Sequence, residues 1–370
     1  AGLRAAAFSQ LTQELLGPAA DPALQFDLFD ALVRDLSDDT LDGKVGMADV
    51  PIQGTAKFLP EDIQNRYTTA LLNFHDSGLM GDTHGNDQTG LTSNQIGILP
   101  FSTVALTDNY RIVYSSMMDP MQGKSVFDLK ITNLSDGSDA TLLSPKLTPL
   151  MNMLDRRHST PFVDFVDNGN GNYSATVYYL MASVTMLGTS NGYWDLGIEV
   201  AAGETAHLYP PVTMAMPSNT QRVQLLGVSD TIIGMDGNPM SRPYNLFRDD
   251  LTAAGSGSYH FDIFIAPMET MLSFPALLDG MTLNSGMGGT PYLVNGVDID
   301  VSVNGGNWMT NKDSDNLDGT WTLNGLSLNS GENEIRVRLT VSGEIKTTNG
   351  DTVTTDVNDF GTFTVTIPTP

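Results

Sequence analysis

Near residue 101 the spacing of apolar residues along the chain changes. Before that point they recur at helical spacing, as in Leu24, Leu28, Leu32 and Leu36. After it, apolar and polar residues alternate, which is typical of strands with one buried face. No amphipathic helix lies between the later strands, which argues against parallel βαβ architecture. We therefore predict a mainly β protein, with two or three antiparallel β-sandwich modules after a small helical N-terminal region.

The pattern also predicts individual elements and modules. Three segments have helical periodicity: 3–16, 22–36 and 60–74. Five segments alternate as strands do: 110–114, 126–132, 172–181, 192–200 and 205–214. We expect a helical region that ends in a Gly/Asn/Asp-rich loop and then three β modules, with bounds 1–100, 101–217, 218–288 and 289–370. Segments 171–180 and 257–266 align weakly, which leaves two interpretations: the second β module is a weak repeat of the first, or the two segments are alike only as any two sandwich strands are.

Composition excludes several functional classes. The 370 residues include 18 Lys and Arg against 43 Asp and Glu, for a formal net charge of -25. Without clustered positive charge, we expect no binding to nucleic acid or to an anionic membrane. The absence of cysteine excludes disulfides, thiolate metal sites and cysteine nucleophiles. No run of about 18 apolar residues is present, so no membrane span is predicted within this chain.

The surface composition indicates where the protein works. The chain is rich in Asp, Asn, Gly, Ser and Thr and poor in Lys. We interpret this as an exported bacterial protein that is periplasmic, attached to the outer surface or extracellular. The first residue is Ala1, which we interpret as the result of processing, and the sequence leaves a lipid anchor open. An acidic cytosolic protein is the alternative.

Methionine is the residue type in surplus, and 15 of the 18 methionines lie between Met117 and Met287. Thioether sulfur is a soft ligand that suits Cu(I). The best cluster is Met151 and Met153, followed by His158, with Met181 further on; prolines at 145, 149 and 161 indicate that this stretch is loop-like rather than core. We predict these side chains as copper ligands. The alternative is that the methionines are flexible fillers of a sandwich core, and both interpretations stay open.

The same stretch carries a resemblance to a known family. The segments that carry it are 144–153, 158–161, 171–173, 179–181 and 192–196. Together they resemble the FixH and YtkA-like domains over about residues 126–200. In that family a Met-rich segment and a His-bearing turn precede strands with the patterns Gly-x-Tyr and Gly-x-Trp-x-Leu. The resemblance implies a small periplasmic β-sandwich associated with copper handling and copper-oxidase assembly.

The last part of the chain resembles another class of module. Turns at 294–297 and 330–333, with Trp321 on a strand between them, are similar to those of bacterial Ig-like modules over about residues 289–370. Such modules act as spacers, stalks or adhesive units, which is what the resemblance implies here. In the same part, Asp313, Asp315 and Asp318 form an acidic loop that is a candidate calcium site. A solvated turn is the alternative.

No enzyme motif has the context that its chemistry requires. The segment 188–192 matches G-x-S-x-G, but a strand follows it where a nucleophile elbow needs a helix. We therefore predict a non-catalytic exported accessory protein that binds copper through Met and His of its middle sandwich. We also expect it to have a protein partner. The alternative is a structural or interaction protein of the cell surface, as a subunit of a filament, surface layer or complex, with no metal role. A hydrolase that uses unplaced carboxylates is a third option.

Overall fold

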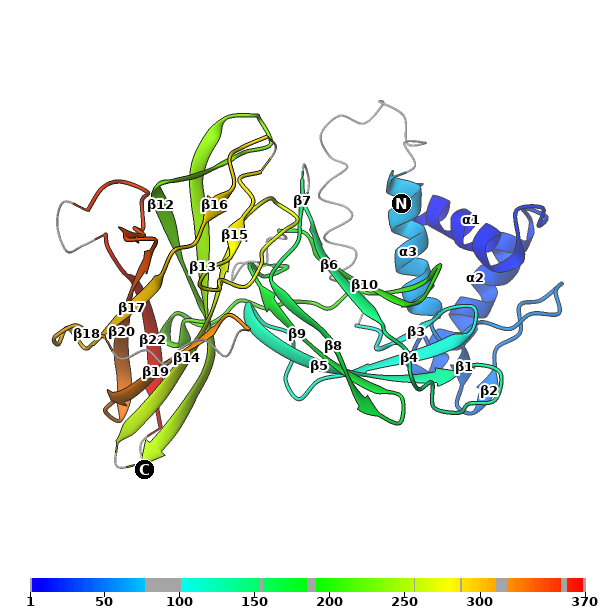
Figure 1. The fold of residues 1–370 in the computed structure, drawn as a ribbon. Helices are drawn as coiled ribbons and strands as arrows, with labels where there is room; N and C mark the ends of the chain where they lie inside the picture. The colour runs from blue at the N-terminus through cyan, green and yellow to red at the C-terminus, as the bar shows by residue number, and fades with distance from the viewer. Residues whose placement is uncertain are drawn as a thin grey trace.

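The structure is a computed structural model that describes residues 2–76, 101–153, 156–184, 191–255, 257–286, 288–310, 318–353 and 358–368. It is mainly β, with antiparallel sheets that follow a few N-terminal helices. Figure 1 shows the helices at one end, a first sandwich in the middle and a second sandwich at the other end. The predicted fold class is therefore confirmed.

The helical region contains α1 (Gly2–Leu16), α2 (Leu24–Asp35), the 3-10 turn η1 (Leu36–Asp38) and α3 (Ile63–Asp76), with a small hairpin of β1 (Lys44–Val45) and β2 (Ala48–Asp49). Its core is formed by Leu11, Leu28 and Ile63, which are fully buried. Helix α2 begins at Leu24, two residues later than predicted. The Asp21 carboxylate accepts a hydrogen bond from the backbone N–H of Ala23, which belongs to the turn that precedes the helix.

The first sandwich, called sandwich 1 below, packs two sheets face to face. One has the order β3 (Val104–Leu106), β4 (Tyr110–Ser115), β5 (Gly123–Asn133), β9 (Asn172–Tyr179) and β8 (Phe162–Gly169). The other has the order β11 (Glu204–Leu208), β10 (Tyr193–Ala201), β6 (Lys146–Asn152) and β7 (Arg157–His158). All five strands predicted from the alternation are present. Strand β11 ends at Leu208, earlier than predicted, because Pro210 and Pro211 have no N–H to donate to a neighbouring strand.

The second sandwich, sandwich 2, follows the 3-10 turn η2 (Pro217–Asn219). One sheet has the order β12 (Arg222–Ile233), β13 (Pro239–Gly255), β14 (Ser258–Pro267) and β19 (Thr320–Ser327). The other has the order β18 (Met309–Thr310), β17 (Val297–Val303), β20 (Gly331–Val341) and β21 (Glu344–Ile345), and β22 (Gly361–Ile367) pairs with β20. A small hairpin, β15 (Thr282–Leu283) and β16 (Tyr292–Leu293), lies beside them.

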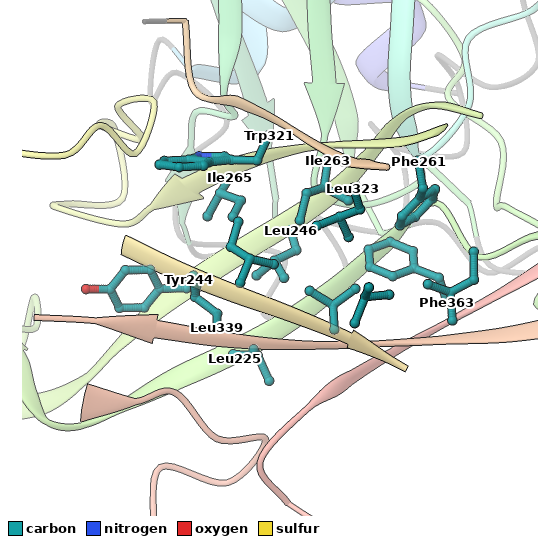
Figure 2. Packing of buried hydrophobic residues seen from close by; sticks show 14 of the residues in the cluster. Leu225, Tyr244, Leu246, Phe261, Ile263, Ile265, Trp321, Leu323, Leu339 and Phe363 are labelled. Atoms are coloured by element: carbon teal, nitrogen blue, oxygen red, sulfur yellow. The ribbon is translucent and has the colours of Figure 1, made fainter. Parts of the chain in front are cut away.

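The expected module boundary between residues 288 and 289 falls inside sandwich 2. Strand β19 pairs with β14 and places Trp321 opposite Ile263. Figure 2 shows Tyr244 and Phe261 of one sheet in the same core as Leu339 and Phe363 of the other. The apolar face of β12–β14 is therefore covered by strands from the last eighty residues. The alternation of apolar and polar residues identified the buried face of each strand, but it did not indicate which strands pack against that face.

The helical region is fixed to sandwich 1 by polar contacts. The Asp62 carboxylate, just before α3, accepts the backbone N–H of Leu106 at 3.0 Å. The Arg111 guanidinium donates to both carboxylate oxygens of Glu61, with Nε 2.7 Å from Oε2. These contacts hold α3 against the β3–β4 end of sandwich 1.

The joint between the two sandwiches combines aromatic and charged groups. The Tyr178 ring of β9 stacks on Phe264 of β14, with centroids 4.1 Å apart and planes at 5°. The Asp249 carboxylate of β13 accepts the Tyr178 hydroxyl at 2.5 Å and the Lys124 ammonium at 2.8 Å. Arg222 of β12 donates to the Leu180 carbonyl at 3.1 Å. Because these side chains are largely buried, the two sandwiches form a specific contact rather than a loose linkage.

Candidate functional site

The structure brings His158 and Met181 together at one end of sandwich 1. The Nε2 atom of His158 lies 3.4 Å from the Sδ atom of Met181. In the β6–β7 pair, His158 is directly opposite Met151. In the neighbouring β6–β10 pair, Met151 is opposite Trp194. Three of the four predicted copper ligands therefore lie around one point, with Trp194 beside them.

A glycine makes this arrangement possible. Gly192, just before β10, has φ +146°, in the region that side chains other than glycine rarely adopt. A Cβ atom there would lie 2.2 Å from the Asn152 carbonyl oxygen and 3.1 Å from the Met151 Cε methyl. The missing side chain lets the start of β10 approach β6 and leaves room for the Met151 thioether.

The fourth predicted ligand, Met153, lies beyond the end of β6. Its N–H donates to the Arg156 carbonyl at 3.0 Å, so the chain has turned away from the strand at this point. Its side chain packs against the edge of the sandwich 1 core, whereas Met151 is fully buried within that core. Strand alternation would place both side chains on one face only if β6 continued through Met153.

The environment of His158 favours the neutral imidazole. Burial lowers the pKa of His158 below its usual value, the Ser159 carbonyl acts in the opposite direction, and Arg222 and Arg156 lower it further. The ring is only 6% exposed. Its Nδ1 atom lies 2.7 Å from the Ser159 carbonyl oxygen, and it meets the Trp194 ring edge-on at a centroid distance of 5.6 Å.

The candidate calcium loop is only partly described. Asp313 and Asp315 lie outside the described residues. The Asp318 carboxylate accepts the N–H of Thr320 at 2.8 Å and so caps the turn that leads into β19. Among the residues that the structure describes, no three His, Asp or Glu side chains are grouped as metal ligands would be. Calcium binding by this loop stays a prediction.

A buried ionic cluster in sandwich 2 was not predicted from the sequence. Arg242 of β13 donates Nε to both oxygens of Asp230 at 3.0 Å, and the Tyr244 hydroxyl donates to the same carboxylate at 2.5 Å. Lys346 lies 3.7 Å from Asp230 and 2.7 Å from Glu344. Burial acts to raise the pKa of Glu344, but hydrogen bonds from Lys346 and Ser229 outweigh it and lower the pKa to about 2. The cluster ties both sheets of sandwich 2 together.

A second histidine, His207 of β11, lies at the joint with the helical region. Its Nδ1 is 2.8 Å from the Asp195 carboxylate, and its ring stacks on Tyr209, whose hydroxyl contacts Thr69 of α3 at 2.9 Å. The hydrogen bond with Asp195 raises the pKa of His207, although burial acts against it. The structure shows His207 on the edge strand β11, paired with Asp195.

Changes in pH should act on the two histidines in opposite directions. The pKa of His158 is lower in the folded state than in the unfolded state. The stability contributed by the neutral His158 is therefore fully present above the unfolded-state pKa of about 6.5, and it is lost as the pH falls from there through the folded-state pKa. The pKa of His207 is higher in the folded state, so its contribution is present below about 6.5 and is lost as the pH rises through the folded pKa. Urea unfolding between about pH 5 and 8 checks this. His158→Gln should remove part of the acid-side decline, and His207→Gln part of the alkaline-side decline; unchanged slopes in both would contradict the assignment.

Comparisons with known proteins return only distant similarity. No family model matches this chain, and no curated protein matches it. The resemblances to FixH and YtkA-like domains and to bacterial Ig-like modules therefore stay predictions.

Solved structures give weak matches at low identity. The Yersinia pseudotuberculosis adhesin InvE is 12% identical over 72% of this chain, with a TM-score of 0.22, and the match spans 61% of that chain. Domains 5–6 of the S-layer protein SbsC are 12% identical over 72% of this chain and 100% of that chain, with a TM-score of 0.20. The Escherichia coli adhesin FdeC is 13% identical over 72% of this chain and 98% of that chain, with a TM-score of 0.21. At such TM-scores the matches carry no argument about function.

Among the helices that the structure describes, none is both long enough and apolar enough to cross a membrane.

Proposed function

We propose that this protein is a non-catalytic, exported bacterial protein that serves as a structural or interaction subunit at the cell surface. The observation that carries the proposal is the joint between the sandwiches, where Tyr178, Asp249 and Arg222 make buried, directional contacts across two modules. Loosely linked domains slide on small, polar interfaces, whereas this joint fixes their relative orientation. A chain of rigidly joined sandwiches is suited to span a distance or to present a surface.

Three buried carboxylates of the described residues are paired with arginines, which supports a structural role. Asp230 is paired with Arg242, Asp359 with Arg338, and Asp62 with Arg66. A catalytic carboxylate must be accessible to a substrate, whereas these three carboxylates are buried and form ion pairs with arginines of the same chain. The acidic surface, with a net charge of -25, further favours a protein or cation as the partner over nucleic acid.

The subunit role predicts a defined assembly. In native cell envelopes treated with an amine-reactive cross-linker, the protein should be recovered in one fixed complex or in a repeating array visible by electron microscopy. Protein denatured before cross-linking is the control, since contacts that need the folded surface are lost there. Recovery as a monomer from intact envelopes, with no cross-linked product, would count against the proposal.

Copper handling is the second candidate function, and one contact favours it. The 3.4 Å approach of His158 Nε2 to Met181 Sδ places two donors that suit Cu(I) side by side. The purified protein, titrated with Cu(I) against a competing chelator, tests the function directly. Stoichiometric uptake supports it, and no measurable uptake by the folded protein rejects it.

A further inference from the structure

We infer that the buried ionic cluster of sandwich 2 is a cross-linking site, in which the Lys346 amine and the Asp230 carboxyl group condense to an amide between their side chains. The bond connects β12 of one sheet to the residue that follows β21 of the other. The inference goes beyond the proposed function, because the bond forms within one chain and does not depend on assembly at the cell surface.

The two reacting groups lie close together in the interior of the sandwich. The Lys346 Nζ atom is 3.7 Å from the Asp230 Oδ2 atom, and neither side chain is more than 1% exposed. Holding two reactants in one geometry makes their reaction effectively unimolecular, which raises its rate by a large factor. Burial also excludes the bulk water that favours hydrolysis of an amide, so the equilibrium shifts towards condensation.

The backbone holds both side chains in position. Asp230 ends a bulge of β12 that begins after Leu226. A Cβ atom on Gly227 would lie 2.2 Å from the Asp230 carbonyl oxygen, so the bulge closes this tightly only with glycine at its start. Leu226 exchanges two backbone hydrogen bonds with Thr347, at 2.6 and 2.9 Å. Because Thr347 follows Lys346 directly, the two segments that carry the reacting groups are hydrogen bonded to each other.

Two donors are aimed at the carboxyl oxygens of Asp230. The Arg242 Nε–H group donates to both oxygens at 3.0 Å, and the Tyr244 hydroxyl donates to Oδ2 at 2.5 Å. When an amine attacks Cγ, negative charge gathers on these oxygens in the tetrahedral intermediate. Fixed donors in a buried site stabilise such a charge strongly, as an oxyanion hole does. Arg242 is itself fixed, because its Nη1 donates to two backbone carbonyls at 2.9 Å.

Glu344 is placed to carry protons for the reaction. Its Oε1 atom lies 2.7 Å from Lys346 Nζ, so it can take a proton from the ammonium group. The backbone N–H groups of Val228 and Ser229 donate to the Glu344 carboxylate at 2.9 and 2.8 Å and hold it in place. The Glu344 side chain is 18% exposed, whereas that of Lys346 is fully buried, so the released water has a path to solvent past Glu344.

The atoms and electrons of the step balance without a further reactant. Glu344 removes a proton from the Lys346 ammonium group, and the freed lone pair on Nζ forms the N–C bond to Cγ of Asp230. The proton passes to a carboxyl oxygen of Asp230, and a second Nζ proton follows by the same route. The C–O bond breaks, its electron pair leaves with that oxygen as water, and the third proton stays on the amide nitrogen. Nothing is oxidised or reduced.

Condensation also removes charges that are costly to bury. The cluster holds two carboxylates and two basic groups. The amide is neutral, so one buried charge of each sign disappears, and Glu344 stays to balance Arg242. The Tyr244 and Tyr292 rings, with centroids 4.8 and 5.5 Å from Lys346 Nζ, cover the amine on their side and keep water away from it.

The first measurement is the intact mass of the folded full chain. We expect the wild type to be lighter than its sequence by the mass of one water molecule. Trypsin should release peptides 223–248 and 339–370 as one joined species, because the Arg242–Pro243 bond resists cleavage and an acylated Lys346 is no longer a cleavage site. Tandem mass spectrometry of that species locates the bond.

Three variants test the roles of the residues. Lys346→Arg keeps the positive charge, but its guanidinium is not a nucleophile, so this variant should have its full sequence mass. In chains recovered unfolded from inclusion bodies and then refolded, the water loss should appear at least about a hundredfold more slowly in Glu344→Gln than in the wild type, because glutamine cannot take up the proton. Lys124→Arg is the matched control: Lys124 forms an ion pair with Asp249 at 2.8 Å, and this variant should lose water as the wild type does.

Thermal melting followed by circular dichroism confirms that each variant is folded. If Lys346→Arg does not fold, the joined peptide of the wild type decides alone. A folded wild type with its full sequence mass after prolonged incubation at neutral pH would overturn the inference and leave the cluster as an ion pair. A water loss that persists in folded Lys346→Arg would come from a succinimide at an Asp–Gly pair and would overturn it as well. Neither result bears on assembly at the cell surface, which the cross-linking of envelopes tests separately.

Discussion

Replacing Asp230 by Asn lowers the free energy of unfolding of sandwich 2 by about 3–5 kcal/mol. Asp230 is the shared counter-ion of Arg242 and Lys346, and all three side chains are at most 1% exposed. Asparagine keeps the size of the side chain but leaves two buried cations with Glu344 as the remaining anion nearby. Breaking a buried ion pair from one side is costly, because the charge that remains has lost both water and partner.

The measurement is urea unfolding followed by circular dichroism. The exposed Glu332→Gln is the matched control, since it removes one negative charge from the same sandwich and should change stability by less than about 0.5 kcal/mol. Adding Arg242→Met to Asp230→Asn should recover part of the loss, because one unpaired charge is removed. A decrease in Asp230→Asn no larger than in the control would mean that the cluster does not stabilise the fold.

The second large effect concerns the joint. Tyr178→Ala should uncouple the two sandwiches, so that they unfold at separate denaturant concentrations. Tyr178 supplies the stacked ring on Phe264 and the hydroxyl bound by Asp249, and its loss leaves a cavity in the joint. Removing a buried aromatic side chain costs about 3–5 kcal/mol, and here the loss falls on the contact between modules.

Two tryptophans make the uncoupling visible. Trp194 reports on sandwich 1 and Trp321 on sandwich 2, each studied with the other and Trp308 replaced by Phe. In the wild type the two unfolding curves should coincide, and in Tyr178→Ala they should separate. Tyr178→Phe is the matched control because it keeps the ring and loses only the hydroxyl, so its curves should stay together. If the curves already separate in the wild type, the stiff joint that carries the proposed function is wrong.

The sequence was a good guide to which residues are buried. The alternation correctly predicted the strands around Phe127, Tyr173 and Leu196, and Trp194 and Trp321 on two such strands are 0% and 3% exposed. The period of two reports only on a strand's own faces. It gave no information on which strands share a core, so the pairing of β19 with β14 had to come from the fold.

The candidate site shows the same limit at the level of single residues. The stretch with Met151 was interpreted as loop-like because of its prolines, and this was wrong: Met151 lies on β6, which runs to Asn152, and is fully buried. The hydrogen bond from Trp194 to the Met181 carbonyl depends on how β10 approaches the end of β9, which strand alternation does not show. The cluster around Asp230 was missed for a related reason. Arg242 and Tyr244 follow Asp230 closely in the sequence, but Lys346 and Glu344 lie more than a hundred residues further on, and a buried charge is recognised only when its partners are known.

The order of strands in sandwich 2 also has a consequence for biosynthesis. Its first strand is held by its last, since the Thr220 N–H just before β12 donates to the Thr364 carbonyl of β22. Sandwich 1 uses strands from Val104 to Leu208 and has all of its pairing partners as soon as that stretch has been synthesised. Sandwich 2 stays incomplete, with apolar strands uncovered, until about 150 further residues have followed. Strands left uncovered in this way are prone to aggregate, so we expect this half of the chain to be the more aggregation-prone part during synthesis.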